Sequence, residues 1–572
     1  MAPTIDALLA SFESAKSHFG RSASSELKLL LDQLSRHKFR DPKSLIRFHE
    51  TLLFLRAFPQ SPSLVPRLER LLNRFHERVD ELRKLGGDME AFDDFDTSGI
   101  AGTTMQDTLN FEAARWLVRR LPRNVEIAWQ DYEEERAMGS SWPRFVPLLA
   151  EDSYVEANIP WRRWLDAARG PERDVKWLIR RFERFPVGES GKDRSRERAE
   201  LYDSLCIPLR WHLGNLKFSR TRNWKRPRQF YYHNEPLIAR SQVSLADELA
   251  KPSPHLVKVP LRDGEQVMDT IREVMTVRYR ELYGTTFGDP RSVMRCVLGR
   301  GVVMYFWNLP PERRLPLRAY VAGFTLKNGV PINYIEAIGL CDWIEVGFNT
   351  FYTYRQGETA WIYAQALRCL CAFTGVTTIS VYPYQIGQNN DEAIDSGAFW
   401  FYRKLGFRSG RKELEQIARS EERKIAANPQ YRTSKKTLKR LAEAHVFYEL
   451  PGGERFAWDE FSTRNVGLRV NRRMAREFDG ESVRIGEASV SEVSRALDLR
   501  VSGWNSAELR ALENWSLVLT LIPNLRNWSR KEKLETAKMI RAQAGSNEIR
   551  YLRRTQQHLR LREELLQLGS KG

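Results

Sequence analysis

The first 200 residues carry apolar side chains at helical spacing. One stripe follows the i, i+3, i+4, i+7 pattern that places side chains on a single helix face, and it consists of Leu27, Leu30, Leu31 and Leu34. A second stripe runs over residues 64–82 and stops at Gly86-Gly87, a pair that ends helices. The pattern predicts an α-helical domain over residues 1–200.

The periodicity changes at about residue 255, where short runs of β-branched and aromatic residues replace the helical stripes. Strands are predicted over 255–261, 302–309, 318–326, 332–338, 343–352 and 378–382. Asn328-Gly329 has the composition of a two-residue hairpin turn. Helices are predicted over 359–373 and 396–405, and helix again over 411–572. We therefore expect an α+β multidomain chain, in which a central mixed sheet with helices lies between helical regions at either end.

Charge divides the chain in the same places. The 572 residues have a formal net charge of +18, but residues 1–200 are neutral. The connector 201–254 carries +5, the α/β region 255–410 carries +3, and the C-terminal region 411–572 carries +10. Such asymmetry can mark a surface for nucleic acid or for an acidic protein. The predicted partner surface therefore lies in the connector and the C-terminal region.

The densest basic segment is 217–228, where six Lys and Arg residues alternate with aromatic ones. Basic and aromatic groups together can hold a phosphate backbone and stack on bases. The alternative is a connector whose aromatic side chains pack on a neighbouring domain. No nucleic-acid motif accompanies the segment, and this favours the packed connector over a nucleic-acid surface.

Composition narrows the class of protein. The apolar runs are shorter than the roughly 18 residues that suggest a membrane span. The N-terminal stretch lacks the basic start of a secretion signal, and five cysteines do not make a paired disulfide framework. Cys369 and Cys371 have neither a second cysteine pair nor a nearby histidine, so no metal site is expected. These features predict a cytoplasmic protein without a membrane or metal partner.

The most specific motif is SGAFWFYRKLGF, residues 396–407. It resembles the C-terminal motif of the GNAT superfamily of N-acetyltransferases, in which a helix carries a small residue, then an aromatic pair ending in Tyr, then Lys-Leu-Gly-Phe. The family spacing is matched by Ala398, Phe401, Tyr402, Leu405, Gly406 and Phe407. Upstream, a predicted strand leads into TYRQGETA, residues 353–360, and then into a helix. The resemblance identifies residues 255–410 as a GNAT-like acyltransferase domain.

In that family the strand-to-helix turn is an Arg/Gln-x-x-Gly-x-Gly/Ala loop that binds the pyrophosphate of coenzyme A. Backbone N–H groups and the positive helix end favour an anion there. Arg355 and Ala360 match the first and last positions, while Glu358 stands at the central Gly and Gly357 is shifted by one. A carboxylate facing the pyrophosphate would repel it. The cofactor-binding residues that the resemblance implies are Asn349, Thr350, Arg355, Gln356, Gly357, Glu358, Thr359, Ala360 and Asn390.

The resemblance implies transfer of an acetyl group from acetyl-coenzyme A to an amine acceptor in a ternary complex. Tyr402 is the implied acid for the departing thiolate. No histidine occurs between residues 256 and 410, so the base candidates in this region are Glu336 and Glu345. They are nine residues apart, which would put them on opposite faces of one unbroken strand. Breaks at Gly339 and Asp342 leave the choice open, with Glu345 preferred because it is nearer the loop.

Two other functions compete with this hypothesis. A catalytically inactive GNAT-like scaffold or binding protein would explain Glu358 in the loop. A nucleic-acid-associated protein would explain the basic flanking regions. The acceptor is not identified by any of these patterns.

Overall fold

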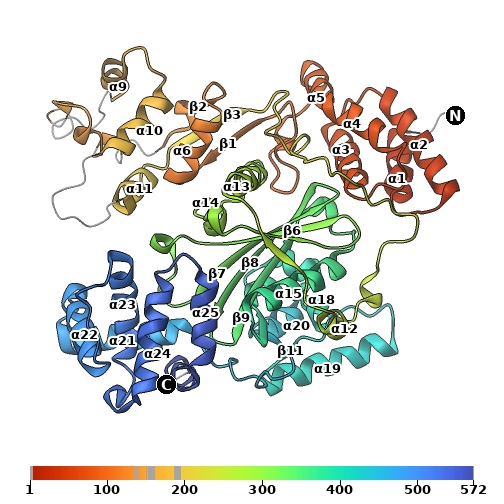
Figure 1. Cartoon of the computed structure of the whole chain (residues 1–572). Coiled ribbons are helices and arrows are strands. Elements are labelled where there is room, and N and C mark those ends of the chain that lie inside the picture. Colours follow the sequence, from red (N-terminus) through yellow and green to blue (C-terminus); the bar gives the residue numbers. More distant parts are fainter. Residues whose placement is uncertain are drawn as a thin grey trace. The chain divides into compact units, whose positions relative to one another are not determined.

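A computed structural model describes residues 4–133, 138, 139, 141–149, 151, 161–185 and 195–570. The chain forms two compact units, coloured along the sequence in Figure 1. The first consists of Met1–Pro236, Val267–Phe287 and Asn328–Pro331, and the second of Leu237–Gln266, Gly288–Lys327 and Ile332–Gly572.

The first unit begins with helices whose starts are encoded locally. The Thr4 side chain caps α1 and Asp41 caps α3, which has Pro42 in its first turn. The stripe expected over 64–82 is divided at Arg74 between two helices. The helices of this unit are α1 (Ile5–Ala15), α2 (Arg21–Arg36), α3 (Pro42–Ala57), α4 (Val65–Asn73), α5 (Phe75–Lys84), α6 (Phe111–Arg120), α9 (Trp161–Arg169), α10 (Asp174–Arg184), α11 (Ser195–Asp203) and α14 (Tyr283–Thr286). Helix α13 (Leu261–Thr276) begins in the second unit and continues in the first.

Two strands lie within the first 200 residues, where only helices were expected. β1 (Thr104–Thr108) and β2 (Val125–Ile127) flank β3 (Pro208–His212) in an antiparallel sheet of order β1-β3-β2. β1 buries only Met105, and β2 is three residues long. Neither strand is long and apolar enough to show the alternation of apolar and polar residues that predicts a strand. A core rich in tryptophan packs around the sheet, with Trp142, Trp177 and Trp211 buried.

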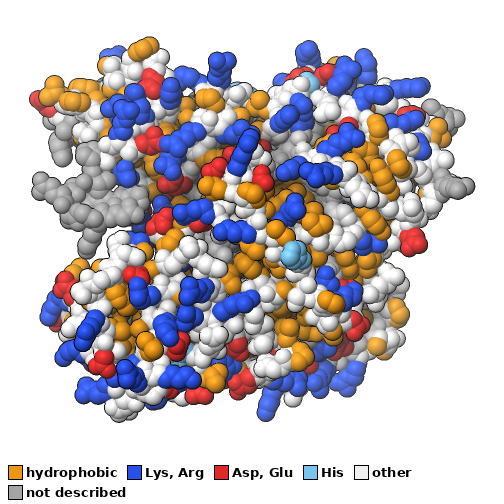
Figure 2. Space-filling view, in the orientation of Figure 1, with side chains coloured by type: hydrophobic (Ala, Val, Ile, Leu, Met, Phe, Trp, Pro, Cys, Tyr) orange, Lys and Arg blue, Asp and Glu red, His pale blue; other side chains and the backbone are white. Residues whose placement is uncertain are grey.

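The basic segment 217–228 is partly built into the first unit. Phe218 belongs to its core, and Arg220 is buried and ion-paired with Glu50. The Trp224 indole donates a hydrogen bond to the Asn328 carbonyl oxygen at 3.0 Å. Exposed cations remain at Lys217, Lys225, Arg226 and Arg228. On the face shown in Figure 2, Lys and Arg side chains are spread over both units instead of forming one patch.

The second unit is built on a nine-stranded sheet of order β11-β12-β10-β9-β8-β7-β6-β5-β4. The chain is thus α+β, with a large mixed sheet surrounded by helices. β9 pairs in parallel with β10, whereas β8 on one side and β12 on the other pair antiparallel. The strands are β4 (Leu256–Lys258), β5 (Met294–Val297), β6 (Val302–Asn308), β7 (Ala319–Lys327), β8 (Val330–Leu340), β9 (Trp343–Thr350), β10 (Thr378–Val381), β11 (Arg408–Ser409) and β12 (Val446–Glu449). The turn at Asn328-Gly329 has positive φ at both residues, as a two-residue hairpin requires.

The sheet extends past residue 410, because β12 is paired between β10 and β11. The helices of this unit are α12 (Leu245–Ala250), α15 (Thr359–Thr374), α16 (Pro383–Ile386), α17 (Asp391–Asp395), α18 (Ala398–Lys404), α19 (Lys412–Ala427), α20 (Lys435–Leu441), α21 (Thr463–Phe478), α22 (Ser482–Ala496), α23 (Ser506–Leu519), α24 (Arg530–Gln543), α25 (Glu548–Gln557) and α26 (Leu559–Gly569). Among the described residues, no helix combines the length and apolar character needed to cross a membrane.

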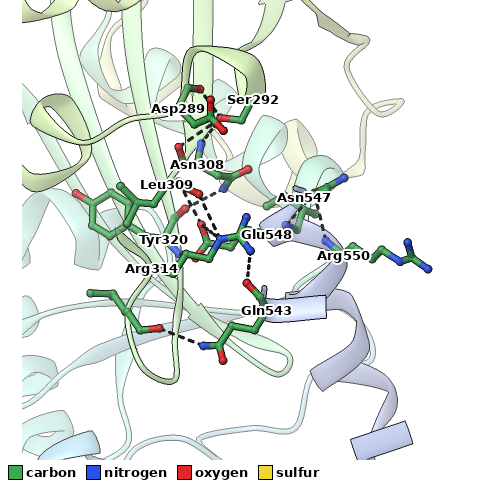
Figure 3. Close-up of polar contacts among 12 residues, drawn as sticks. Asp289, Ser292, Asn308, Leu309, Arg314, Tyr320, Gln543, Asn547, Glu548 and Arg550 are labelled. Atoms are coloured by element: carbon green, nitrogen blue, oxygen red, sulfur yellow. Dashed lines mark hydrogen bonds and ion pairs between the residues drawn. The ribbon is translucent and has the colours of Figure 1, made fainter. Parts of the chain in front are cut away.

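Helix α25 is joined to the sheet by a buried carboxylate. Glu548, in its first turn, is 1% exposed and accepts hydrogen bonds from the backbone N–H groups of Leu309 (3.2 Å) and Tyr320 (3.0 Å). Arg314 Nε lies 3.7 Å from its carboxylate (Figure 3). Burial outweighs these contacts and raises the pKa of Glu548 to about 7.

Candidate active site

The candidate site lies where the two parallel strands β9 and β10 stop pairing. β10 pairs with β9 only as far as Ser380 opposite Glu345. β9 continues to Thr350, where it is still paired with Asn333 of β8. The second half of β9 therefore has a free edge on the side of β10.

The free edge offers backbone donors. The Asn349 carbonyl oxygen faces β8, where it accepts a hydrogen bond from Asn333 Nδ2 at 2.8 Å. Because backbone groups alternate along a strand, the N–H groups of Phe348 and Thr350, beyond the last pairing with β10, point to the opposite side, toward the opening. A donor in this position can hold an oxygen that becomes negative during acyl transfer.

A cavity of about 540 Å³ occupies this opening. Its size is within the range of small-molecule binding sites. One end is lined by Arg355, Gln356, Gly357, Thr359 and Ala360, and the other side by Phe401 and Tyr402 of α18. Asn349, Thr350 and Asn390 also line it. Of the implied cofactor-binding residues, the cavity gathers all except Glu358.

The end of the cavity at α15 is suited to an anion. The first hydrogen bond within the helix runs from the Ile362 N–H to the Glu358 carbonyl oxygen, which leaves the N–H groups of the first helical residues without intrahelical acceptors. These groups and the helix dipole favour negative charge. Arg355 adds a guanidinium, which is partly engaged by Glu392.

Glu358 turns away from the cavity into the protein interior. Its side chain is fully buried, with Oε2 3.0 Å from Lys327 Nζ and Oε1 2.8 Å from Arg300 Nε. The expectation that this carboxylate would face a bound pyrophosphate is therefore not met. Two cations compensate its charge inside the unit, and Glu392 is the acidic side chain that lines the cavity. Burial, with a smaller contribution from Arg300, lowers the pKa of Lys327 to about 8 although the Glu358 carboxylate opposes the shift.

Glu336 and Glu345 lie on the same face of the sheet. A two-residue turn at Cys341 and Asp342 joins β8 to β9, so that Glu336 is opposite Gly347 and Glu345 is opposite Ile338. Paired residues share a face, and residues two apart on a strand share it too. On one unbroken strand, their nine-residue spacing would put the two carboxylates on opposite faces. Across this hairpin, the same spacing puts them on one face. Phe348 is on the other face, where its ring contacts Tyr363 of α15.

The two glutamates have different surroundings. Glu336 accepts a hydrogen bond from the Tyr320 hydroxyl, and burial raises its pKa while this bond opposes the shift. Glu345 lies 3.6 Å from Arg318 Nη1, and its Oε2 is 2.9 Å from Nε2 of His445. His445 immediately precedes β12, and its ring contacts Tyr382 after β10 with centroids 5.3 Å apart. The structure thus places His445 in contact with Glu345, the carboxylate that the sequence favoured as the base.

The glutamate face continues toward the cavity. Glu345, Gly347 and Asn349 alternate along one face of β9, and a side chain at Gly347 would meet Gln385 Nε2 at 3.6 Å. Gln385 and Asn349 both line the cavity. At about 3.3 Å per residue, Glu345 is roughly 13 Å along the strand from Asn349. Neither Glu345 nor Glu336 lines the cavity itself.

Tyr402 lies on the cavity wall with its ring among aromatic neighbours. It contacts Tyr363, Phe401 and Phe407 with ring centroids 5.2 to 5.7 Å apart. Within the described part of the chain its hydroxyl has no hydrogen-bond partner. Burial raises the pKa of this hydroxyl above its ordinary value, so it keeps its proton at neutral pH.

Three features were not expected from the sequence: His445, Gln385 and the segment from Leu237 to Arg240. Gln385 and this segment line the cavity. His445 had a recognisable signal, because the apolar run Val446–Tyr448 follows it inside a region read as helical. Gln385 is in the four-residue helix α16 and Arg240 begins a short 3-10 helix, Arg240–Gln242, and neither sequence has a motif. No group of three or more His, Cys, Asp or Glu side chains arranged to hold a metal occurs in the described ranges.

Neither a protein-family model, nor a curated protein, nor a solved structure matches the chain.

Proposed function

We propose that the chain is an acyl-coenzyme A-dependent N-acyltransferase, with acetyl-coenzyme A as donor and an amine as acceptor. The observation that carries the proposal is the cavity between the diverging ends of β9 and β10, which reaches the N-terminus of α15. It combines an anion-binding helix end, free strand donors and Tyr402, and these are the parts that the motifs at 353–360 and 396–407 imply. The inward pairing of Glu358 removes the charge conflict that favoured an inactive scaffold.

Different groups of the chain accept a proton, stabilise the oxyanion and donate a proton. When bound, the thioester supplies the acyl group and a thiolate leaving group. Glu345, with His445 behind it, accepts the proton that the amine must lose before its nitrogen attacks the carbonyl carbon. A strand N–H on the free edge of β9 stabilises the oxyanion as the carbon–nitrogen bond forms. Tyr402 gives its proton to sulfur as the carbon–sulfur bond breaks, and the proton that the nitrogen loses on becoming an amide restores the Tyr402 hydroxyl.

Hydrogen–deuterium exchange of the full-length chain tests this assignment of the site. Adding acetyl-coenzyme A should slow exchange in peptides that cover residues 346–362 and 385–402. The segment 217–228 provides an internal comparison, because it belongs to the first unit and does not line the cavity. Protection confined to other segments, or absent at millimolar ligand, would contradict the proposal.

A further inference from the structure

The segment from Leu237 to Arg240 forms one wall of the cavity and is held by hydrogen bonds within the second unit. The Ile238 N–H donates to Glu358 Oε1 at 3.3 Å, and the Ala239 N–H donates to the Gln242 side chain at 2.8 Å. Farther along, Glu248 of α12 accepts a hydrogen bond from Gln365 of α15 at 2.8 Å. We call residues 237–240 the strap. These hydrogen bonds hold the strap in place as one wall of the cavity.

The strap is held by the buried charges described above. Glu358 accepts from the strap while it pairs with Lys327 and Arg300. A buried carboxylate with two cationic partners has few alternative positions, since any of them would leave a charge unpaired. The residue that replaces the family glycine is therefore a positioning residue for the cavity wall.

The strap ends in a cation that is not neutralised. Arg240 lines the cavity, and within the described residues its guanidinium has neither an ion pair nor a hydrogen bond. Lys404, at the end of α18, is likewise without an acidic partner among the described residues. Burial lowers the pKa of Arg240. Burial and the positive charges of Arg240 and Arg432 lower the pKa of Lys404.

Neighbouring positive charges favour the binding of an anion between them. The acidic side chain that lines the cavity, Glu392, is already engaged by Arg355. The cavity lining therefore has two cationic parts, one at Arg355 and the start of α15 and the other at Arg240, and the exposed Lys404 outside the lining adds positive charge near Arg240. A ligand that satisfies both must carry two separate anionic groups.

We propose that Arg240, with Lys404, binds the 3′-phosphate of coenzyme A, while the start of α15 and Arg355 bind its pyrophosphate. The proposal rests on the proposed function and adds a specificity determinant from outside the motifs. A guanidinium suits a phosphomonoester because it can donate two parallel hydrogen bonds.

Calorimetric titrations of the full-length protein with coenzyme A and with 3′-dephospho-coenzyme A test this proposal. The variants are Arg240→Gln, Lys404→Gln and, as a matched control, Arg526→Gln at an exposed position outside the cavity. We expect the wild type and the control to prefer coenzyme A by about tenfold, because a charge-assisted pair is lost with the phosphate. In Arg240→Gln the preference should fall to about one- to threefold, with the affinity for the dephospho ligand unchanged.

Equal affinity of the wild type for both ligands would overturn the subsite while leaving the proposed function in place. A loss of affinity for both ligands to the same extent in Arg240→Gln would also overturn it, because Arg240 would then act on the whole ligand. If the wild type binds neither ligand, the proposed function fails and the subsite fails with it. Unchanged melting temperatures of the variants show that altered binding does not come from unfolding.

Discussion

Nε2 of His445 lies 2.9 Å from Oε2 of Glu345, although the two residues are one hundred positions apart in the chain. The contact depends on β12, which returns to the sheet beside β10 and brings His445 to the face that carries Glu345 and Glu336. A carboxylate and an imidazole in hydrogen-bond contact can accept a proton and share it. This pair is the strongest candidate for the base in the proposed reaction.

Removing the carboxylate of the pair should slow acyl transfer. Glu345→Gln keeps the shape of the side chain but cannot accept a proton, so thiol release from acetyl-coenzyme A should fall by about 10²- to 10⁴-fold. His445→Gln should also slow it, and the double variant should be little slower than Glu345→Gln if the two act as a unit. Unchanged release in Glu345→Gln would remove this residue as the base, and the same assay on Glu336→Gln would then test the second carboxylate.

The Tyr402 hydroxyl should matter for turnover more than for binding. Tyr402→Phe removes the proton proposed for the leaving thiolate and keeps the ring among its aromatic neighbours. Turnover should fall by at least about tenfold, while the dissociation constant for coenzyme A changes by less than about threefold. Tyr363→Phe is the matched control, since its buried hydroxyl also lacks a hydrogen-bond partner among the described residues but does not line the cavity. Equal turnover in wild type and Tyr402→Phe would exclude Tyr402 as the acid.

Replacing Glu358 by glycine, the residue that the GNAT motif has at this position, should lower the free energy of unfolding. Glu358→Gly would leave Lys327 and Arg300 without their buried counter-charge, and losses of about 3–5 kcal/mol are typical of such a change. Urea unfolding of the variant measures the loss. Adding Lys327→Met to Glu358→Gln should recover part of the stability, because it removes one uncompensated charge. Wild-type stability in Glu358→Gly would contradict the role assigned to this carboxylate.

Glu548 should make stability depend on pH. Its pKa is raised from 4.5 to about 7 in the folded protein, so between these values the native state keeps a proton that the unfolded chain has lost. Its contribution is fully present below pH 4.5 and is lost as the pH rises through 7. At 1.36 kcal/mol per pKa unit, the loss is about 3 kcal/mol. Denaturant unfolding at pH 4.5 and 7.5 should show the advantage of wild type over Glu548→Gln shrinking by this order. A pH-independent difference would show that the carboxylate stays ionised throughout.

The sequence predicted the central strands and the turn at Asn328-Gly329, because these features depend on local periodicity. Nine of the candidate site residues that it singled out line the cavity, because two contiguous motifs contribute most of them. The orientation of Glu358 could not be read in this way. It depends on Lys327 and Arg300, which tertiary packing brings to the start of α15. The shared face of Glu336 and Glu345 depends on where one hairpin turns, and a shift of one residue would reverse it. His445 was missed because β12 is a short strand within helical sequence.

The central claim is tested most directly by calorimetric titration of the full-length chain with acetyl-coenzyme A. We expect one site per chain with a dissociation constant of about 1 μM to 1 mM, weakened about tenfold by Arg355→Gln and unchanged by Arg526→Gln. No heat of binding at millimolar ligand, or equal binding by wild type and Arg355→Gln, would contradict it.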